Sequence, residues 1–581
     1  MRPAGSSKGY SPAGNVAVDS YPEWPNLAAM MLSRARVWPT RPMLRHFRDG
    51  DWRSTSWGAF GRQAAAAARA LRAAGVSAGD RVMIVSENRP EFPIAETALM
   101  AIRAVPVPAY TTNTGADHAH ILRDSGARAA IVSNPALAAR VLEGAAQASG
   151  LDLLVCMEGK VEGGAVPTLA WDSLIADLPP PDDIAAEAET IPPGMLACII
   201  YTSGTGGAPK GVMLAHRCIL SNCRGAFELL RPLKLRDELY LSFLPLSHAY
   251  EHTAGQFFLL SIGTEIAYAR GLEHLAADLM AVKPTIMTMV PRVLEVLRGR
   301  ILSQVQRQPA RRQALFHRAV ALGMNRLDGA RLTIVERIWD AALEVLVRRK
   351  VRARFGGRFR AAMSGGARLE PEVGRFFLSL GISIMQGYGQ TEAGPVISAN
   401  PPDAIRIDSV GTVLEGVDLR IAEDGEILVR GDLVMDGYWG QPGATAAVIQ
   451  DGWLHTGDIG ALDADGYLRI TDRKKDMIVL SGGDNISPAR VEGMLMAEPE
   501  IAQAVVAGEG QAALTALVVP AEGYDEVAVA LAVTRVNKRL SVVERIRKHS
   551  VVPPFTLENG LLTPTQKIRR TLAIRTYADA L

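Results

Sequence analysis

The stretch that decides the fold is Tyr201-Thr202-Ser203-Gly204-Thr205-Gly206-Gly207-Ala208-Pro209-Lys210-Gly211, which directly follows the apolar residues 196–200. The apolar run predicts a buried parallel strand. Glycines let backbone N–H groups face an anion, hydroxyls add hydrogen-bond donors, and a lysine adds positive charge. The residues after the strand are therefore predicted to form an exposed loop that binds the phosphates of a nucleotide.

This loop is not a Walker A motif, because that motif has Ser or Thr directly after its Gly-Lys pair, whereas here Gly211 follows Lys210. A solvated glycine-serine loop is the simpler alternative. The order of residue types is more restrictive, however, and it resembles the phosphate loop of the adenylate-forming (AMP-binding) superfamily. That superfamily includes acyl-CoA synthetases, luciferases and nonribosomal adenylation domains. It usually has a second threonine where this chain has Gly206, so one phosphate-facing hydroxyl is missing here.

The composition limits the class of protein. The 581 residues predict several domains, and 48% hydrophobic with 21% charged residues is typical of a folded globular chain. The net charge of +2 gives no reason to expect nucleic acid as a partner. There is no apolar run near the roughly 18 residues of a membrane helix and no signal-peptide core. We expect a cytoplasmic protein, with peripheral contact at the inner face of the membrane left open. Four reduced, buried thiols are expected, at Cys156, Cys198, Cys218 and Cys223.

The predicted fold class is α/β. Strand and helix patterns alternate along the first half of the chain, which is typical of βαβ units around mostly parallel sheets. Residues 179–193 read as a surface connection, and residues 301–354 predict a solvated helical hairpin. Hairpin turns then predict a small antiparallel sheet or barrel, at Asp424-Gly425, Asp451-Gly452 and Asp465-Gly466.

These patterns and the resemblance predict two domains. The first is a large N-terminal adenylation domain at 1–472, with α/β subdomains at about 1–190 and 191–400 and a barrel-like part at 401–472. The second is a smaller, mobile α+β domain at 473–581, with a hinge at 472–476.

Other segments match the nucleotide site of the superfamily. By resemblance, Tyr388 stacks on adenine, Thr391 bonds the α-phosphate, and Asp458 accepts the ribose hydroxyls. Core packing for Tyr388 and a surface role for Glu392 are the alternatives. The residues expected to bind ATP or AMP are Thr202, Ser203, Gly204, Thr205, Gly206, Gly207, Lys210, Gly365, Gly366, Ala367, Gly387, Tyr388, Gly389, Thr391, Asp458, Arg473 and Lys567. Those expected to hold Mg2+, which prefers oxygen ligands, are Thr205 and Glu392.

The resemblance also implies catalytic roles. Lys567 would bridge the substrate carboxylate and the α-phosphate and offset the charge of the transition state, although a generic anion patch is the alternative. Lys475 would be the hinge residue, although a lysine in a charged run is usually just solvated. The full catalytic set is Lys567, Thr391, Glu392, His248 and Lys475. Residues beside the pantetheine tunnel would bind CoA: Ser481, Gly482 and Gly483.

One motif leaves an alternative of a different class. His248-Ala249-Tyr250-Glu251-His252 fits the H-x-x-E-H zinc signature, in which two histidines on one face of a helix bind the metal. The residues before it, 244–248, resemble the acyl-pocket motif of the superfamily, in which the histidine is an aromatic wall and gate near the carboxylate. Short patterns match by chance, so the acyl pocket is favoured over zinc.

The resemblance covers about residues 26–577 and is closest to long-chain fatty acyl-CoA synthetases, through segments 243–252, 354–358 and 555–565. It implies a ligase that uses Mg2+, ATP and CoA to convert a long-chain fatty acid first to acyl-AMP and then to acyl-CoA. A CoA ligase for medium-chain or aromatic acids is the alternative. Gly255 and residues 284–296 line either the acyl pocket or the core. A homodimer also stays open.

Overall fold

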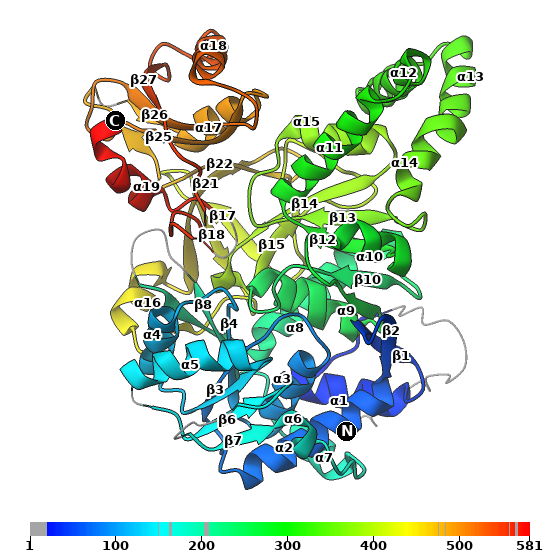
Figure 1. The fold of residues 1–581 in the computed structure, drawn as a ribbon, viewed down its shortest axis with the longest axis vertical. Helices are drawn as coiled ribbons and strands as arrows, with labels where there is room; N and C mark the ends of the chain where they lie inside the picture. The colour runs from blue at the N-terminus through cyan, green and yellow to red at the C-terminus, as the bar shows by residue number, and fades with distance from the viewer. Residues whose placement is uncertain are drawn as a thin grey trace, which may run out of the picture.

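The structure is a computed structural model that describes residues 20–148, 150–161, 166–202, 208–474, 476–482, 484–556, 558–563 and 567–581. It has a mixed α/β architecture, with a large N-terminal domain and a smaller C-terminal domain (Figure 1). The domain boundary at 472–476 stays a prediction. Several predicted site residues lie outside the described residues: Ser203, Gly204, Thr205, Gly206, Gly207, Lys475 and Gly483.

Two large sheets form the core of the N-terminal domain. The first is entirely parallel, in the order β4 (Val105–Ala109), β3 (Arg81–Val85), β5 (Ala129–Val132), β6 (Leu153–Cys156) and β7 (Thr168–Ala170). The predicted alternation is confirmed, because helices connect its strands: α3 (Glu91–Ala101), α4 (Gly115–Ser125) and α5 (Pro135–Gln147). A parallel sheet with helices between its strands places its loops at the carboxyl edge.

The second sheet has nine strands. Its parallel centre contains β11 (Glu265–Tyr268), β10 (Leu239–Ser242), β12 (Ile286–Met289), β13 (Ala361–Ser364) and β14 (Ser383–Gly389). Antiparallel strands β15 (Val396–Ala399) and β16 (Thr412–Val413) extend one edge. The other edge is β1 (Pro42–Arg48) and β2 (Asp51–Ser56), so a segment from the start of the chain completes a sheet formed mainly by later residues.

The strand before the phosphate loop differs from the prediction. β8 (Leu196–Thr202) is antiparallel to β9 (Lys210–Ala215), which pairs with β19 (Gly437–Tyr438). Successive side chains of β8 enter different cores: Cys198 and Ile200 join one hydrophobic cluster, and Ile199 and Tyr201 join another. Burial on both faces makes the sequence continuously apolar, and this pattern is the one that parallel strands normally show.

The helix α1 (Leu27–Val37) was also missed by the sequence analysis. Its residues from Leu27 to Leu32 are all buried, so no amphipathic period marks it. In the predicted surface connection, α7 (Asp182–Glu189) forms a short helix whose Ile184 and Ala188 are buried. Tertiary packing, rather than local pattern, stabilises both helices.

The small antiparallel sheet is confirmed. It contains β17 (Asp418–Ile421), β18 (Glu426–Arg430), β20 (Ile449–Gln450), β21 (Trp453–Leu462) and β22 (Leu468–Arg473). All three predicted Asp-Gly turns connect paired strands, and the glycines have φ values of 84°, 78° and 80°. The left-handed region is accessible to glycine without steric cost.

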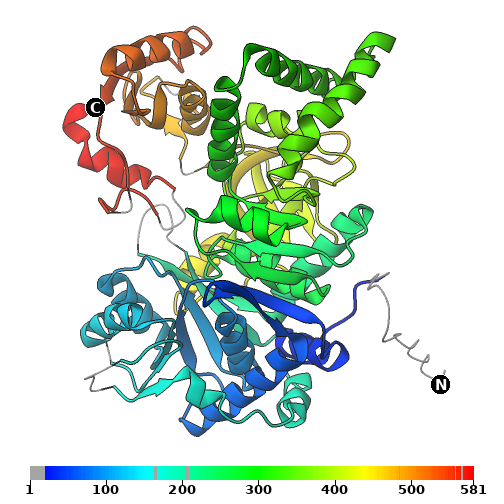
Figure 2. The same cartoon turned by 45° about the vertical axis from the view of Figure 1, so that its right-hand side comes forward.

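A helical excursion projects from the N-terminal domain, as predicted (Figures 1 and 2). It contains α11 (Pro291–Gln306), α12 (Ala310–Leu327), α13 (Ile334–Leu343), the π-helix η3 (Glu344–Arg348) and α14 (Arg349–Ala353). The smaller C-terminal domain contains β25 (Ile501–Ala507), β26 (Leu514–Pro520), β27 (Ile546–Val551), α17 (Pro488–Met496), α18 (Glu526–Asn537) and α19 (Arg570–Thr576). Among the described residues, no helix has the length and hydropathy that a membrane crossing requires.

Candidate active site

A cavity of about 990 Å³ lies between the two domains. One part of its wall is polar and the other part is formed by aliphatic and aromatic side chains. Many of the predicted site residues line it: Thr202, His248, Gly365, Gly366, Gly387, Tyr388, Gly389, Thr391, Glu392, Arg473 and Lys567. Loops far apart in the sequence therefore meet at one place.

Three of the predicted residues form a bonded group at the polar end. The Tyr388 hydroxyl donates to Asp458 Oδ2 at 2.6 Å, and Arg473 Nε donates to Asp458 Oδ1 at 2.8 Å. Asp458 and Arg473 are opposite each other on β21 and β22, so the sheet register brings them together. The group fixes a carboxylate between a flat ring and a guanidinium at the edge of the cavity.

Glycines allow close backbone approach around this group. A Cβ on Gly389 would lie 1.9 Å from the carbonyl oxygen of Pro395, and a Cβ on Gly365 would lie 3.0 Å from the Tyr250 ring. No other residue type fits at Gly389 without backbone movement. Ala367 is exposed and does not line the cavity.

Glu392 lies at the cavity wall, where the Tyr438 hydroxyl donates to its Oε1 at 2.8 Å. Lys210 Nζ lies 4.8 Å from the centre of the Tyr438 ring. Lys210 itself does not line the cavity. The donor set fits Mg2+, because one carboxylate with phosphate oxygens is the usual way in which proteins hold this ion.

Two residues that hold the ends of the predicted phosphate loop were not predicted from the sequence. His120 Nε2 lies 2.8 Å from the carbonyl oxygen of Pro209, so the ring donates to the end of the loop. At the other end, the Tyr201 hydroxyl donates to Asp124 at 2.6 Å. Both His120 and Asp124 are on α4, four positions apart, and therefore lie on one helix face. No motif in the sequence marks this contact.

Lys567 reaches the cavity from the C-terminal domain. The Thr563 N–H donates to the Lys567 carbonyl at 2.8 Å, and the Lys567 N–H donates to the Thr563 hydroxyl at 3.0 Å. Arg570 anchors the segment by donating to Glu492 at 2.6 Å. The lysine side chain is exposed to the cavity, but the surrounding walls limit its solvation. This burial, together with Arg473, lowers the pKa of Lys567 to about 8, and Asp458 acts in the opposite direction. Ser481 and Gly482 are exposed and do not line the cavity.

His248 lines the cavity, close enough to Lys567 for the ammonium charge to act on its ring. Its Nδ1 accepts a hydrogen bond from the Tyr250 N–H at 3.2 Å, so the neutral ring carries its proton on Nε2. Burial, with a smaller contribution from the charge of Lys567, lowers the pKa of His248 to about 4. The imidazole is therefore a neutral hydrogen-bond donor at physiological pH.

Asn88 holds the loop that carries His248, and this residue too was not predicted from the sequence. Its side-chain amide donates to Ser242 at 2.9 Å and to the carbonyl of Leu244 at 2.7 Å, and its oxygen accepts from the N–H of Leu246 at 3.0 Å. Asn88 lies in the loop after β3, at the carboxyl edge of the first sheet. It therefore connects the first sheet to the second.

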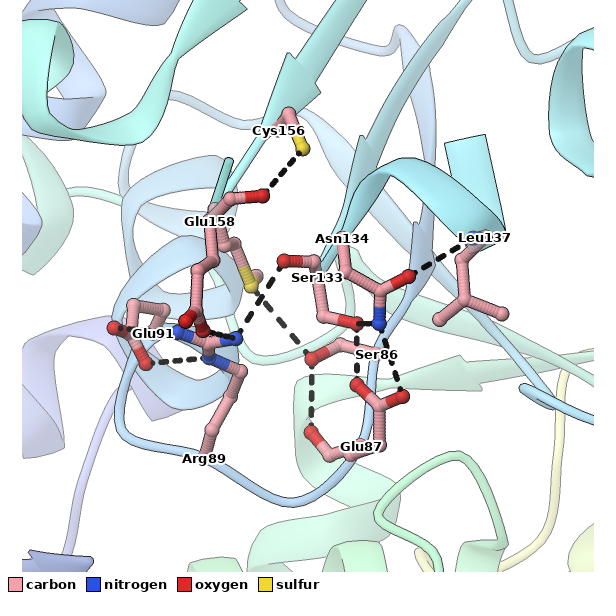
Figure 3. Close-up of polar contacts among 10 residues, drawn as sticks. Ser86, Glu87, Arg89, Glu91, Ser133, Asn134, Leu137, Cys156 and Glu158 are labelled. Carbon is pink, nitrogen blue, oxygen red and sulfur yellow. Dashed lines mark hydrogen bonds and ion pairs between the residues drawn. The ribbon is translucent and has the colours of Figure 1, made fainter. Parts of the chain in front are cut away.

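A polar cluster fixes the loop that contains Asn88 (Figure 3). Arg89 donates to Glu91 at 2.8 Å and to Glu158 at 3.2 Å. Glu87 accepts from Ser133 and Asn134, at the end of the neighbouring strand β5. These contacts cross the ends of β3, β5 and β6 and position the loop as one unit.

The apolar part of the cavity extends from His248 between α8 (His216–Leu230) and the helices that follow Glu251. Aliphatic and aromatic side chains form most of its wall: Ala226, Leu229, Leu230, Leu233, Leu235, Phe258, Leu259, Ile286 and Met287. Part of the 284–296 stretch thus lines the cavity, whereas Gly255 does not. A wall of this composition suits a hydrocarbon chain.

The three residues of the H-x-x-E-H motif have different partners. Glu251 accepts hydrogen bonds from Tyr240 at 2.8 Å and from Ser242 and Thr288 at 2.6 Å. His252 Nε2 lies 2.5 Å from Glu96 Oε1, while His248 faces the cavity. Within the described ranges, no three His, Cys, Asp or Glu side chains are grouped to hold a metal. The zinc alternative has no support from this geometry.

Glu251 is fully buried beside Tyr240 and Thr288, two residues of the cavity wall, and burial raises its pKa to about 7. The folded protein therefore binds this proton more tightly than the unfolded chain does. The resulting stabilisation is present below about pH 4.5 and is lost as the pH rises through about 7, a change of roughly 3 kcal/mol.

We expect Glu251→Gln to gain thermal stability relative to the wild-type protein as the pH rises from 5 to 8, because Gln does not titrate. The melting temperatures of both proteins at the two pH values test this expectation. Glu522→Gln, an exposed position, is the control and should show no such trend. If the melting temperatures of Glu251→Gln and wild type differed by the same amount at pH 5 and at pH 8, the raised pKa of Glu251 would be contradicted.

Protein-family models, known proteins and solved structures all include examples similar to this chain. The AMP-binding enzyme family model matches residues 32–439, and the AMP-binding enzyme C-terminal domain model matches residues 475–581. Long-chain-fatty-acid–CoA ligase FadD15 of Mycobacterium bovis is 33% identical over 96% of each chain. Long chain acyl-CoA synthetase 7, peroxisomal, of Arabidopsis thaliana is 30% identical over 92% of this chain and 82% of its own. The crystal structure of the anthranilate CoA ligase AuaEII has the same fold, with a TM-score of 0.75 and 21% identity over 96% of this chain and 99% of that chain.

Proposed function

Since the chain belongs to the AMP-binding enzyme family, we propose that it is an ATP-dependent acid–CoA ligase that acts on long-chain fatty acids. The observation that carries the proposal is one cavity whose wall contains His248, the predicted nucleotide-binding residues and a set of aliphatic side chains. A fatty acid in the apolar part would present its carboxylate to the polar part. Relatives named as long-chain ligases align along nearly the whole chain and support the same substrate class.

In the first half-reaction, a carboxylate oxygen attacks the α-phosphorus of ATP, a new O–P bond forms, and pyrophosphate leaves. Tyr388 is proposed to stack on adenine, with Asp458 and Arg473 at the ribose hydroxyls. Neutral His248 donates a hydrogen bond near the substrate carboxylate. Thr391 and Lys567 donate to the α-phosphate oxygens that gain negative charge in the transition state. Mg2+, held by Glu392 and Thr205, would neutralise phosphate charge when bound.

In the second half-reaction, the CoA thiolate attacks the acyl carbon, a thioester forms, and AMP leaves. Lys567 lies at the cavity and Ser481 and Gly482 do not, an arrangement that suits the first half-reaction. We propose that rotation of the C-terminal domain about Lys475 exchanges the two segments, with a few residues absorbing the backbone change. CoA would then reach the acyl-AMP beside Ser481, Gly482 and Gly483.

Lys475→Pro is expected to slow thioester formation strongly while acyl-AMP formation continues, because proline restricts the backbone change at a hinge. Single-turnover measurement of both half-reactions tests this expectation. Unchanged rates in both would argue against a hinge at this residue.

Acyl-AMP formation is expected to fall above about pH 8, because Lys567 acts in its charged form and its pKa is lowered to about 8. Each further pH unit should reduce kcat/KM for ATP about tenfold, since this parameter follows ionisation in the free enzyme. Lys567→Arg should extend activity to higher pH, because arginine stays charged. A wild-type profile that is flat to pH 10 would contradict the role.

The proposed function is tested by AMP release with ATP, Mg2+ and CoA across acids from acetate and benzoate to palmitate and oleate. CoA-dependent release that peaks with long-chain acids is the expected result. A maximum with benzoate or medium-chain acids would favour the alternative ligase. Cytoplasmic location, peripheral membrane contact and a homodimer are further parts of the proposal, whereas a nucleic-acid partner is not.

A further inference from the structure

The helical excursion carries an exposed apolar stripe on α13 and η3. Its large aliphatic side chains are far more exposed than is usual: Ile334 77%, Val335 63%, Ile338 66%, Val345 58% and Leu346 48%. Ile334 and Ile338 are four positions apart, and Val345 and Leu346 lie seven and eight positions after Ile338. This spacing places all five on one side of the helix.

The stripe is not the inner face of the hairpin. The opposite side of the same helices packs inward through Leu343 and Val347, which belong to the main hydrophobic cluster with Phe316 of α12. Arg318 lies over Trp339 at 4.3 Å and helps to join α12 to α13. The excursion therefore has an inner face that packs against α12 and an outer face whose apolar side chains are exposed.

The excursion is also strongly basic. Residues 307–354 contain twelve Arg or Lys residues and four Asp or Glu residues, although the whole chain has a net charge of only +2. Its acidic side chains are already engaged: Asp328 pairs with Arg375, Asp340 with Arg326 and Arg348, Glu344 with Arg352, and Glu336 caps Thr333. Within the described part of the chain, no ion pair is recorded for Arg331, Arg337, Arg349 or Lys350, which flank the stripe.

We propose that the α13–η3 stripe docks the protein on an anionic lipid surface. An aliphatic stripe with Arg and Lys on its flanks is the arrangement by which surface helices bury their apolar side chains at the lipid headgroup boundary. The hairpin projects from the domain, so a flat surface can reach the stripe (Figures 1 and 2). A second copy is disfavoured, because a symmetric contact would bring the two basic excursions together. This proposal rests on the peripheral membrane contact proposed above and gives it a surface, but it is independent of the catalytic activity, so vesicle binding and AMP release test the two separately.

Sedimentation with vesicles tests the proposal without any substrate. The full-length wild-type protein should bind phosphatidylcholine vesicles that contain phosphatidylglycerol, and binding should weaken as salt rises. Ile334→Ser with Ile338→Ser should reduce the partition coefficient at least tenfold. Arg337→Gln with Lys350→Gln should weaken binding and reduce its salt dependence. All four positions are exposed, so melting temperatures should stay near that of the wild-type protein.

A matched control is available on α18, where Val527 and Leu531 are 68% and 58% exposed. Val527→Ser with Leu531→Ser should bind vesicles as the wild-type protein does. Failure of the wild-type protein to bind anionic vesicles would overturn the proposal, as would equal binding by the Ile334→Ser, Ile338→Ser variant. Light scattering completes the test: a dimer that this variant disrupts, without vesicle binding, would assign the stripe to contact between copies instead.

Discussion

Lys567→Ala is expected to reduce acyl-AMP formation by about 10³-fold, the scale on which a cation at a phosphoryl-transfer transition state acts. The side chain is exposed to the cavity, and its backbone is held by two hydrogen bonds with Thr563 and, nearby, by the Arg570–Glu492 ion pair. Removal of the ammonium group should therefore leave the fold intact. Thioester formation from supplied acyl-AMP should stay within about threefold of the wild-type rate, because Lys567 is proposed to leave the cavity before that step.

The measurements are pyrophosphate exchange for the first half-reaction and CoA-dependent AMP release from acyl-AMP for the second. Lys548→Ala is the control, since this exposed lysine belongs to the same domain and, within the described residues, its side chain donates to the carbonyl of Leu581, away from the cavity. If the rates of both half-reactions fell equally, the role proposed for Lys567 in acyl-AMP formation would be wrong. Loss in the Lys548 variant would indicate a general effect on the domain.

Glu392→Gln is expected to reduce acyl-AMP formation by about 10²-fold and to raise the Mg2+ concentration that gives half-maximal rate. The physical reason is the loss of the carboxylate charge that attracts the ion, while the shape of the side chain is kept. Tyr438→Phe is a graded companion variant, because it removes only the hydrogen bond that orients Glu392. We expect it to reduce the rate by about tenfold, the lower end of what one hydrogen bond to a charged group contributes.

Pyrophosphate exchange measured over a series of Mg2+ concentrations tests this prediction. The melting temperature of each variant without nucleotide shows whether the fold is kept. A Glu392→Gln protein with an unchanged Mg2+ dependence would show that Glu392 is not part of the metal site. The Tyr438→Phe result would then report only on the surroundings of the Glu392 side chain.

The position of the His248 loop shows what sequence patterns cannot predict. The motif at 244–252 indicated an acyl pocket or a zinc site, and both interpretations rest on the same residues. The structure separates them because Glu251 bonds to β10 and β12 while His252 bonds to Glu96 on α3. Partners more than 150 residues away, such as Glu96 and Asn88, leave no local signal near residue 248.

The sequence by itself determined the family resemblance, the fold class, the three Asp-Gly turns and part of the cavity lining, because these depend on local residue types with strict backbone or chemical demands. Only the tertiary structure decided that β8 is antiparallel, that α1 is a buried helix, and that His120 and Asn88 hold the loops of the site. A strand or helix that is buried on two faces lacks the alternation of apolar and polar residues that would identify its type from the sequence. Long-range hydrogen bonds depend on which loops the packed sheets bring together, and that arrangement is a property of the whole chain.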